Sequence, residues 1–241
     1  MSLLEVKSVS KSFKGLSALS NVDADINEGE IVGLIGPNGA GKTTLFNVIT
    51  GFIPPDSGQI ILRGEDIVDL KPYQICQRGL VRTFQIVKPF LDLTVLENVL
   101  AGAYNSVNDK KEATDIALEV LEFVGMTHRK NDLARILTIA ELKNLELVRA
   151  LSTKPSICLV DEAMSGLNPK EVDDMLETIN RVRTERKITV LIIEHTMRAI
   201  MNVSDHIIVL DHGEKIAMGT PAEVTSNPKV IEAYLGEEVE S

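Results

Sequence analysis

The chain has 241 residues, 44% hydrophobic and 25% charged, and its 25 Lys and Arg against 35 Asp and Glu give a formal net charge of −10. This composition is typical of a globular protein with a sizeable core, and the negative charge argues against a surface that coats nucleic acid. No apolar run approaches the roughly 18 residues that span a bilayer, and we expect no signal peptide at the N-terminus. Cys76 and Cys158 lack metal-ligand spacing, which favours a protein of the reducing cytosol.

The first residues predict two strands, Leu3–Val9 and Ala18–Ile26, joined by a loop. Phe13 is the aromatic residue of this loop. It is either a core residue or a ring that stacks on a nucleotide base, because stacking accepts any base and leaves little signature in a sequence.

The stretch Ile31–Ile49 combines an apolar run, a glycine-rich loop and a helical pattern. Ile31–Ile35 predicts a buried strand, residues 36–43 fit G-x-x-x-x-G-K-[ST], and helix-like spacing follows from Thr44. In such a loop the backbone N–H groups and the helix dipole hold phosphate, while Lys42 reaches the β- and γ-phosphates and the Thr43 hydroxyl ligates magnesium. The residues expected to bind a nucleoside triphosphate are Gly36, Asn38, Gly39, Ala40, Gly41, Lys42, Thr43 and Thr44.

The next elements are a strand at Gln59–Leu62, a short helix at Lys71–Arg78 and a strand at Leu80–Phe84 that ends at Gln85. Gln85 is either a polar edge residue or a ligand group, since strand ends in α/β sheets face the ligand crevice. A mostly helical block follows from Thr94 to about Ser152 and opens with a capping box. Because this block interrupts the β/α alternation, it predicts an inserted subdomain. Its last helix carries apolar residues at helical spacing, namely Leu142, Leu145, Val148 and Leu151.

Four apolar residues, Ile157–Val160, predict a buried strand that is followed by two carboxylates. In an enzyme with a phosphate loop, the first acid, Asp161, holds the magnesium shell. Glu162 is then placed to orient or deprotonate the attacking water. A strand followed by an acidic helix cap is the structural alternative, which the upstream phosphate loop makes less favourable.

The last third of the chain predicts a helix that begins after Asn168-Pro169 and a buried strand at Ile188–Ile193. His195 follows this strand and is either a γ-phosphate sensor or an incidental polar residue. A hairpin of Ile207–Leu210 with Lys215–Met218 and two short helices complete the chain.

Taken together, these elements resemble an ATP-binding cassette (ABC) ATPase over essentially the whole chain. Residues 36–44 match the Walker A loop, Gln85 the Q-loop, residues 157–162 the Walker B strand, His195 the switch histidine and Phe13 the adenine-stacking position. Within the family the chain is most similar to the ATPases of branched-chain amino acid importers, through residues 82–85, 93–99, 166–169 and 234–236. The ATPase of lipopolysaccharide transport shares the C-terminal residues but resembles the middle of the chain less.

The resemblance implies an α/β fold: a P-loop NTPase core with a mixed sheet and flanking helices, an antiparallel β subdomain and an inserted α-helical subdomain. The single domain would cover residues 1–241, with the core at 1–85 and 153–241 and the helical subdomain at 86–152. The resemblance also implies ATP hydrolysis with Mg²⁺ as cofactor. Glu162, His195 and Gln85 would be catalytic, and Thr43, Gln85 and Asp161 would hold the metal.

The partners that the resemblance implies are transmembrane permease subunits, a second cassette ATPase subunit and, indirectly, a substrate-binding protein, with no nucleic acid. The chain would then be cytoplasmic and peripheral on the inner face of the cell membrane. A DNA-repair or translation cassette is less favoured, because there is no room for a long coiled coil and the chain has one nucleotide domain. An ATP-binding regulator that does not turn over is the third alternative.

One stretch departs from the family pattern. The family's signature reads as a serine, two small residues with a glycine, and a glutamine, and it contacts the γ-phosphate on the partner cassette. Here the matching residues are Leu137-Thr138-Ile139-Ala140-Glu141, so that Thr138 and Ala140 would take the place of the contacting residues. T-x-x-E also predicts a capping box that satisfies the helix's own N–H groups. We therefore expect a homodimer to hydrolyse ATP poorly and the natural partner to be a different cassette chain.

Overall fold

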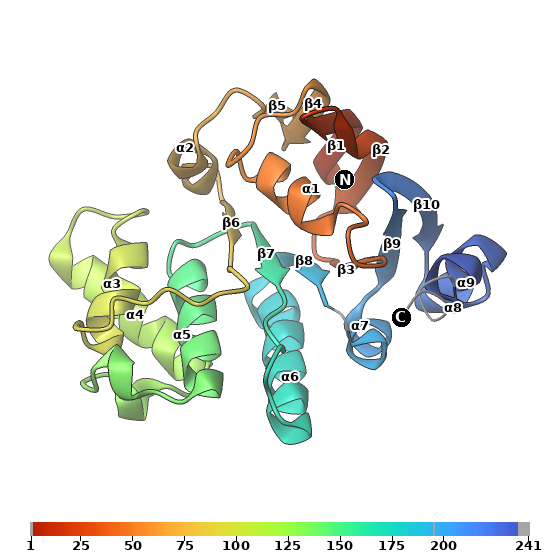
Figure 1. Cartoon of the computed structure of the whole chain (residues 1–241). Helices are drawn as coiled ribbons and strands as arrows, with labels where there is room; N and C mark the ends of the chain where they lie inside the picture. The colour runs from red at the N-terminus through yellow and green to blue at the C-terminus, as the bar shows by residue number, and fades with distance from the viewer. Residues whose placement is uncertain (1, 195, 236–241) are drawn as a thin grey trace. The chain divides into compact units, whose positions relative to one another are not determined.

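The computed structural model describes residues 2–194 and 196–235 (Figure 1). The chain forms two compact units, the first made of residues 1–75 and 189–241 and the second of residues 76–188. The boundaries expected from the sequence, with a helical subdomain at residues 86–152, stay a prediction.

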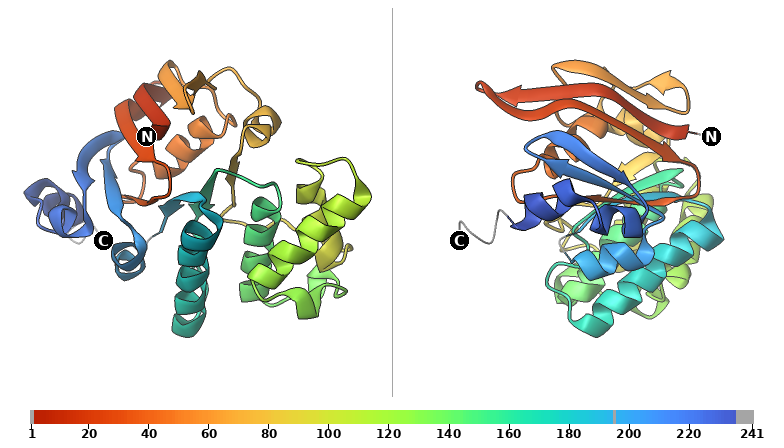
Figure 2. Two further views of the ribbon diagram at one scale, coloured as in Figure 1. Left: turned by 180° about the vertical axis from the view of Figure 1, so that it is seen from behind. Right: turned by 90° about the vertical axis from the view of Figure 1, so that its right-hand side faces the viewer.

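The first unit contains two groups of strands. The antiparallel sheet has the order β2-β1-β4-β5, with β1 (Ser2–Phe13), β2 (Leu16–Asn27), β4 (Ser57–Leu62) and β5 (Glu65–Asp66). The second group runs in the order β10-β9-β3-β8, with β3 (Ile31–Ile35), β8 (Thr189–Ile193), β9 (His206–Asp211) and β10 (Glu214–Gly219). Figure 2 shows β1 and β2 as long neighbouring strands, which pair antiparallel.

Strand β3 is the central strand of its group, because it pairs in parallel with β8 on one side and with β9 on the other. All five of its residues are buried, which agrees with the uninterrupted apolar run expected of a strand covered on both faces. Helix α1 (Lys42–Ile49) follows β3 after the glycine-rich loop and buries Leu45, Phe46, Val48 and Ile49.

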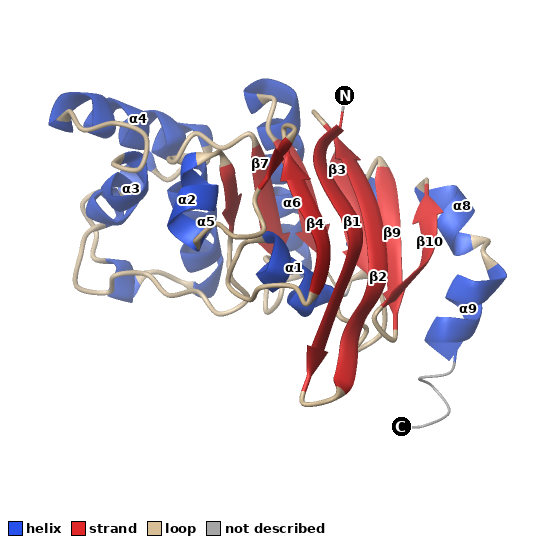
Figure 3. Cartoon of the chain, turned by 90° about the horizontal axis from the view of Figure 1, so that it is seen from above, coloured by secondary structure: helices blue, strands red, loops and turns tan. Residues whose placement is uncertain are grey.

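The remaining helices of the first unit are short. They are α7 (Met197–Val203), α8 (Pro221–Thr225) and α9 (Pro228–Leu235). Figure 3 shows α8 and α9 beside the edge strand β10, and both helices contact this strand. Helix α2 (Pro72–Gln77) spans the boundary between the two units.

The second unit is mostly helical. Its parallel strands β6 (Leu80–Arg82) and β7 (Ile157–Asp161) enclose in sequence the helices α3 (Val95–Ala103), α4 (Lys110–Phe123) and α5 (Ile139–Leu151), with two 3₁₀ turns, η1 (Thr127–Arg129) and η2 (Ala134–Ile136). Helix α3 packs against both α4 and α5, and α6 (Pro169–Arg186) follows β7. The expected capping box at Thr94 and Glu97 opens α3.

This architecture confirms the predicted α/β fold class, with a mixed set of strands, an antiparallel sheet and an inserted group of helices. Strand β3 has the predicted bounds, whereas β1 and β2 are longer than expected because each pairs with the other beyond Val9 and before Ala18. The sequence did not predict β5 or α7. Among the described residues, no helix is both long and apolar enough to cross a membrane.

Candidate functional site

The glycine-rich loop between β3 and α1 is packed too closely for side chains at two positions. Gly36 has φ +150° and Gly41 has φ +101°, both in the region that favours glycine. A Cβ atom on Gly36 would lie 2.0 Å from the carbonyl oxygen of Leu210, and one on Gly41 would lie 2.6 Å from that of Ala18. The loop backbone therefore rests directly on the backbone of β9 and β2, which fixes its path.

The N-terminus of α1 is open to an external acceptor. Its N-cap is Gly41, which supplies no side-chain hydrogen bond, and its first turn holds no acidic residue. By contrast, α3, α5, α6 and α8 each begin with a complete capping box. Since the first N–H groups of a helix have no partner inside the helix, α1 is a good anion-binding terminus.

Lys42 and Thr43 begin α1. The Lys42 ammonium is buried and donates to the carbonyl oxygens of Gly36, at 2.5 Å, and Pro37, at 2.8 Å. A charged group held over the loop is suited to pair with an anion bound in the loop. The Thr43 side chain is exposed, so its hydroxyl is accessible to a ligand, whereas Thr44 is half-buried.

Phe13 lies at the end of β1, opposite Leu16 in the β1–β2 hairpin. The residue is 43% exposed, and the Lys11 ammonium lies 5.7 Å from the ring centroid. The ring is therefore not a core residue, and its role in stacking on a base stays a prediction.

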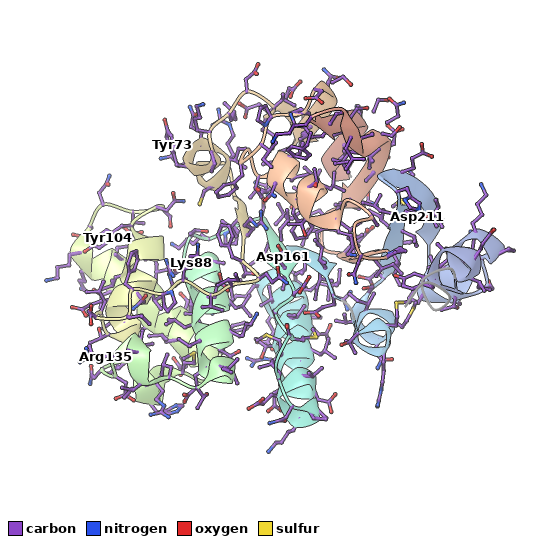
Figure 4. The ribbon with its side chains drawn as sticks, in the orientation of Figure 1. Tyr73, Lys88, Tyr104, Arg135, Asp161 and Asp211 are labelled. Atoms are coloured by element: carbon purple, nitrogen blue, oxygen red, sulfur yellow. The ribbon has the colours of Figure 1, made fainter. Side chains whose placement is uncertain are left out.

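In the second unit, Asp161 ends β7 and is labelled in Figure 4. Its carboxylate accepts a hydrogen bond from the Arg82 guanidinium at 2.6 Å, and the two side chains are only 3% and 5% exposed. Burial raises the pKa of Asp161, and the positive charge of Arg82 opposes that rise. The backbone N–H of Asp161 donates to the hydroxyl of Thr83, the residue after β6, so Arg82 holds the Asp161 side chain and Thr83 holds its backbone.

Glu162 follows immediately and is also buried. The Gln85 side-chain amide donates to the Glu162 carboxylate at 2.7 Å, so the structure brings together two residues that the sequence suggested separately. Glu162 has φ +49°, a left-handed conformation that costs a residue with a side chain of the order of 1 kcal/mol or more. This strain, at a buried carboxylate, marks the position as one that the surrounding structure fixes.

The N-terminus of α5 has the predicted capping box. The Thr138 hydroxyl accepts from the Glu141 N–H at 3.3 Å, and the Glu141 carboxylate accepts from the Thr138 N–H at 2.8 Å. The other carboxylate oxygen accepts from Arg129 at 2.7 Å, and Arg129 also pairs with Asp132. Burial would raise the pKa of Glu141, but hydrogen bonds from Thr138 and Arg129 outweigh it and lower that pKa.

Sequence reasoning missed three residues that surround Asp161 and Glu162. Arg82 pairs with Asp161, Lys143 donates to the carbonyl oxygens of Gln85 and Glu162, and Glu146 accepts from the N–H of Phe84. Two of them, Lys143 and Glu146, could have been found from the sequence, because they are charged residues three positions apart within the apolar repeat of α5. His195 lies outside the described residues.

Two of the predicted metal-binding residues each have a side chain of the kind that binds magnesium together with phosphate. Among the described residues, no group of three or more His, Cys, Asp or Glu side chains could hold a metal alone. Mg²⁺ bound to a nucleotide takes only one or two protein carboxylates, with substrate phosphates and water completing its shell. Asp161 and the exposed hydroxyl of Thr43 are side chains of the right chemistry.

Comparison with known proteins identifies the class. The ABC transporter family matches residues 19–165, and the family of the branched-chain amino acid ATP-binding cassette transporter matches residues 214–240. The chain belongs to the ABC transporter family. It is 41% identical to the high-affinity branched-chain amino acid transport ATP-binding protein BraF of Pseudomonas aeruginosa, in an alignment that covers 98% of each chain.

Two solved structures extend the likeness to three dimensions. The ADP conformation of MJ1267, an ATP-binding cassette of an ABC transporter, has a TM-score of 0.89 and 34% identity, and the match covers 98% of this chain and 99% of that one. The dimeric post-hydrolysis state of the cassette MJ0796, bound to ADP and Pi, has a TM-score of 0.80 and 27% identity, covering 90% and 98%. The chain is an ABC transporter ATPase, which confirms the predicted family and activity.

Proposed function

We propose that this chain binds ATP with Mg²⁺ and hydrolyses it to drive import of branched-chain amino acids through separate transmembrane subunits. The observation that carries the proposal is the phosphate loop, in which Gly36 and Gly41 leave no room for a Cβ atom and after which helix α1 begins without a side-chain cap. A site built from backbone donors and one buried ammonium is suited to a polyphosphate.

In this proposal one group of residues binds the nucleotide and the metal, and a second group activates the attacking water. The N–H groups of residues 36–44 hold the phosphates, Lys42 neutralises the β- and γ-phosphates, and the Thr43 hydroxyl and Asp161 ligate Mg²⁺. The Glu162 carboxylate accepts a proton from the attacking water, and Gln85, which donates to that carboxylate, orients it. Magnesium, when bound, supplies the positive charge that stabilises the transferring phosphoryl group.

The direct test of the phosphate loop is Mg-ATP binding measured by isothermal titration calorimetry. Lys42→Ala is expected to lose most of the binding, because the lysine is the main point charge on the phosphates. Lys110→Met, which changes an exposed lysine of α4, is the matched control and is expected to bind normally. Near-native affinity of Lys42→Ala would contradict the proposed site.

The import of branched-chain amino acids is supported by the relatives' names and by the family that matches residues 214–240. Docking to transmembrane subunits is supported by a group of exposed apolar residues between β6 and α3, namely Ile86, Phe90, Leu91 and Leu93. Ile86→Asp/Leu91→Asp is expected to abolish co-sedimentation with membranes while Mg-ATP binding is retained. Unchanged co-sedimentation would contradict this docking surface.

We further propose that a different cassette chain forms the second half of the ATPase. In this chain the N-terminus of α5 satisfies its own donors through Thr138 and Glu141, and Arg129 holds the Glu141 carboxylate in place. A γ-phosphate of a partner-bound ATP about 4 Å from that carboxylate would be repelled by about 1–4 kcal/mol, depending on solvent exposure. The intact signature of another chain would then complete the Walker site described here.

The test compares the isolated chain with Ala140→Gly/Glu141→Gln. The unmodified chain is expected to dimerise weakly with ATP and to turn over well below about 1 per second. The double substitution removes a methyl group and a charge from the helix terminus and is expected to increase both dimerisation and turnover. Brisk turnover of the unmodified chain, with no gain from the double substitution, would contradict this pairing.

A further inference from the structure

A lysine of helix α5 binds the backbone of the candidate catalytic residue Glu162 and also the backbone of its hydrogen-bond partner Gln85. The Lys143 ammonium donates to the carbonyl oxygen of Gln85 at 3.1 Å and to that of Glu162 at 3.0 Å. The Gln85 amide in turn donates to the Glu162 carboxylate at 2.7 Å. These three hydrogen bonds close a ring that includes Glu162, whose φ is +49°.

Two charged side chains of α5, Lys143 and Glu146, are buried, which costs free energy unless they are paired. Lys143 is 7% exposed and Glu146 is 9% exposed, although such side chains are rarely buried unless they are paired. Glu146 lies one turn after Lys143 and accepts from the Phe84 N–H at 2.8 Å. Burial raises the pKa of Glu146, which that hydrogen bond and the charge of Lys143 oppose. Helix α5 thus holds the adjacent residues Phe84 and Gln85 at two points.

Packing alone does not account for this arrangement. The apolar residues Leu145, Val148 and Leu151 already bury one side of α5, so the helix does not need a buried lysine to pack. The acceptors of Lys143 are backbone oxygens at two positions 77 residues apart, Gln85 and Glu162, whose side chains also bond to each other. A strained conformation such as that of Glu162 persists only where neighbouring groups fix it.

We propose that Lys143 is a positioning residue for ATP hydrolysis: it fixes the backbone of Glu162 and Gln85 and so directs the Glu162 carboxylate. This inference rests on the proposed function of Glu162 as the base that activates water. Lys143 itself touches neither nucleotide nor water in this mechanism. Its contribution is expected in turnover and not in nucleotide affinity, because its ammonium is held by the carbonyl oxygens of Gln85 and Glu162, two residues of the proposed hydrolytic machinery.

The test measures Mg-ATP affinity and single-turnover hydrolysis, with enzyme in excess over radiolabelled ATP, for the full chain. Lys143→Met keeps the length of the side chain and removes its donors. It is expected to slow hydrolysis about 10–100-fold, as a misplaced catalytic group does, with affinity changed less than about twofold. Lys143→Arg keeps the positive charge and has N–H donors for both carbonyl oxygens, and it is expected to recover the rate to within about threefold of the wild type. Lys110→Met is the matched control, with an unchanged rate.

A double-mutant cycle separates positioning from general stability. If Lys143 acts through the ring of hydrogen bonds, Gln85→Ala breaks the same ring. The loss of hydrolysis rate in the double variant Gln85→Ala/Lys143→Met is therefore expected to be at least about threefold smaller than the product of the two single losses. A loss in the double variant equal to the product of the two single losses would mean that Lys143 has a merely structural role, and it would overturn the proposal. Lys143→Gln, with one amide donor group, is expected to give an intermediate rate and provides the test if the methionine variant does not fold.

The outcomes also separate this inference from the function on which it rests. A wild-type chain that binds no Mg-ATP, or releases no phosphate from it, would contradict the proposed function. A wild-type chain that hydrolyses ATP, with Lys143→Met within about twofold of its rate, would overturn only the role of Lys143.

Discussion

The buried ion pair between Arg82 and Asp161 allows a quantitative prediction about stability. Its atoms are 2.6 Å apart, and the side chains are 5% and 3% exposed. Arg82→Met leaves the Asp161 carboxylate buried without its cation, a change that typically costs about 3–5 kcal/mol. For a chain of this size, 1 kcal/mol corresponds to about 2–4 °C in Tm, so we expect Tm to fall by about 6–20 °C.

The matched control is a second arginine–aspartate pair of the same unit, Arg135 with Asp92. Their atoms are 3.1 Å apart, but the side chains are 56% and 89% exposed. An exposed pair contributes about 0–1 kcal/mol, so Arg135→Met is expected to change Tm by less than about 4 °C. Figure 4 labels Arg135 and Asp161.

The assay is thermal unfolding followed by circular dichroism, without nucleotide or Mg²⁺. Arg82→Met/Asp161→Asn is expected to melt above Arg82→Met, because the uncompensated charge is gone. If Arg82→Met melts no lower than Arg135→Met, or if the second substitution restores nothing, the reasoning about burial is wrong.

Two further predictions follow from the pKa shifts. Burial raises the pKa of the Cys158 thiol to about 12, so in Cys76→Ser the native protein is expected to react with a disulfide reagent only on unfolding; rapid reaction of the native chain would contradict this. Hydrogen bonds from the Thr94 backbone and side chain lower the pKa of Glu97. A lowered carboxyl pKa contributes stability above its unfolded value of 4.5 that is lost as the pH falls through the folded pKa. The Tm advantage of the wild type over Glu97→Gln is therefore expected at pH 7 and expected to shrink as the pH falls below 4.5, and a pH-independent difference would contradict it.

The sequence predicted the elements whose signals are local. Residues 31–35 form a strand with the expected bounds, because a strand covered on both sides needs an unbroken apolar run. The capping boxes at Thr94 and Thr138 are equally local, since each depends on residues three positions apart. The ends of β1 were not predicted, because the polar residues after Val9 are held in the strand by pairing with β2.

The candidate site shows the same division. The glycine loop and the two acids after β7 are contiguous patterns and were found. The partners of those acids come from positions far apart in the chain, as with Arg82 and Asp161, and only the fold brings them together. The apolar pattern of α5 predicted that Leu142 lies on the buried side of the helix. In the structure Leu142 is only half-buried, and its neighbour Lys143 is buried. Periodicity does not reveal a lysine that is buried to bind backbone oxygens.

The central claim is that the phosphate loop binds ATP and that Glu162 is needed for its hydrolysis. Glu162→Gln tests it most directly, because glutamine keeps the shape of the side chain and removes the base. Mg-ATP affinity by calorimetry and single-turnover phosphate release are measured on the same samples. We predict unchanged affinity with hydrolysis slowed by about 100-fold or more, the range of a lost general base. Hydrolysis at the wild-type rate would show that Glu162 is not the base.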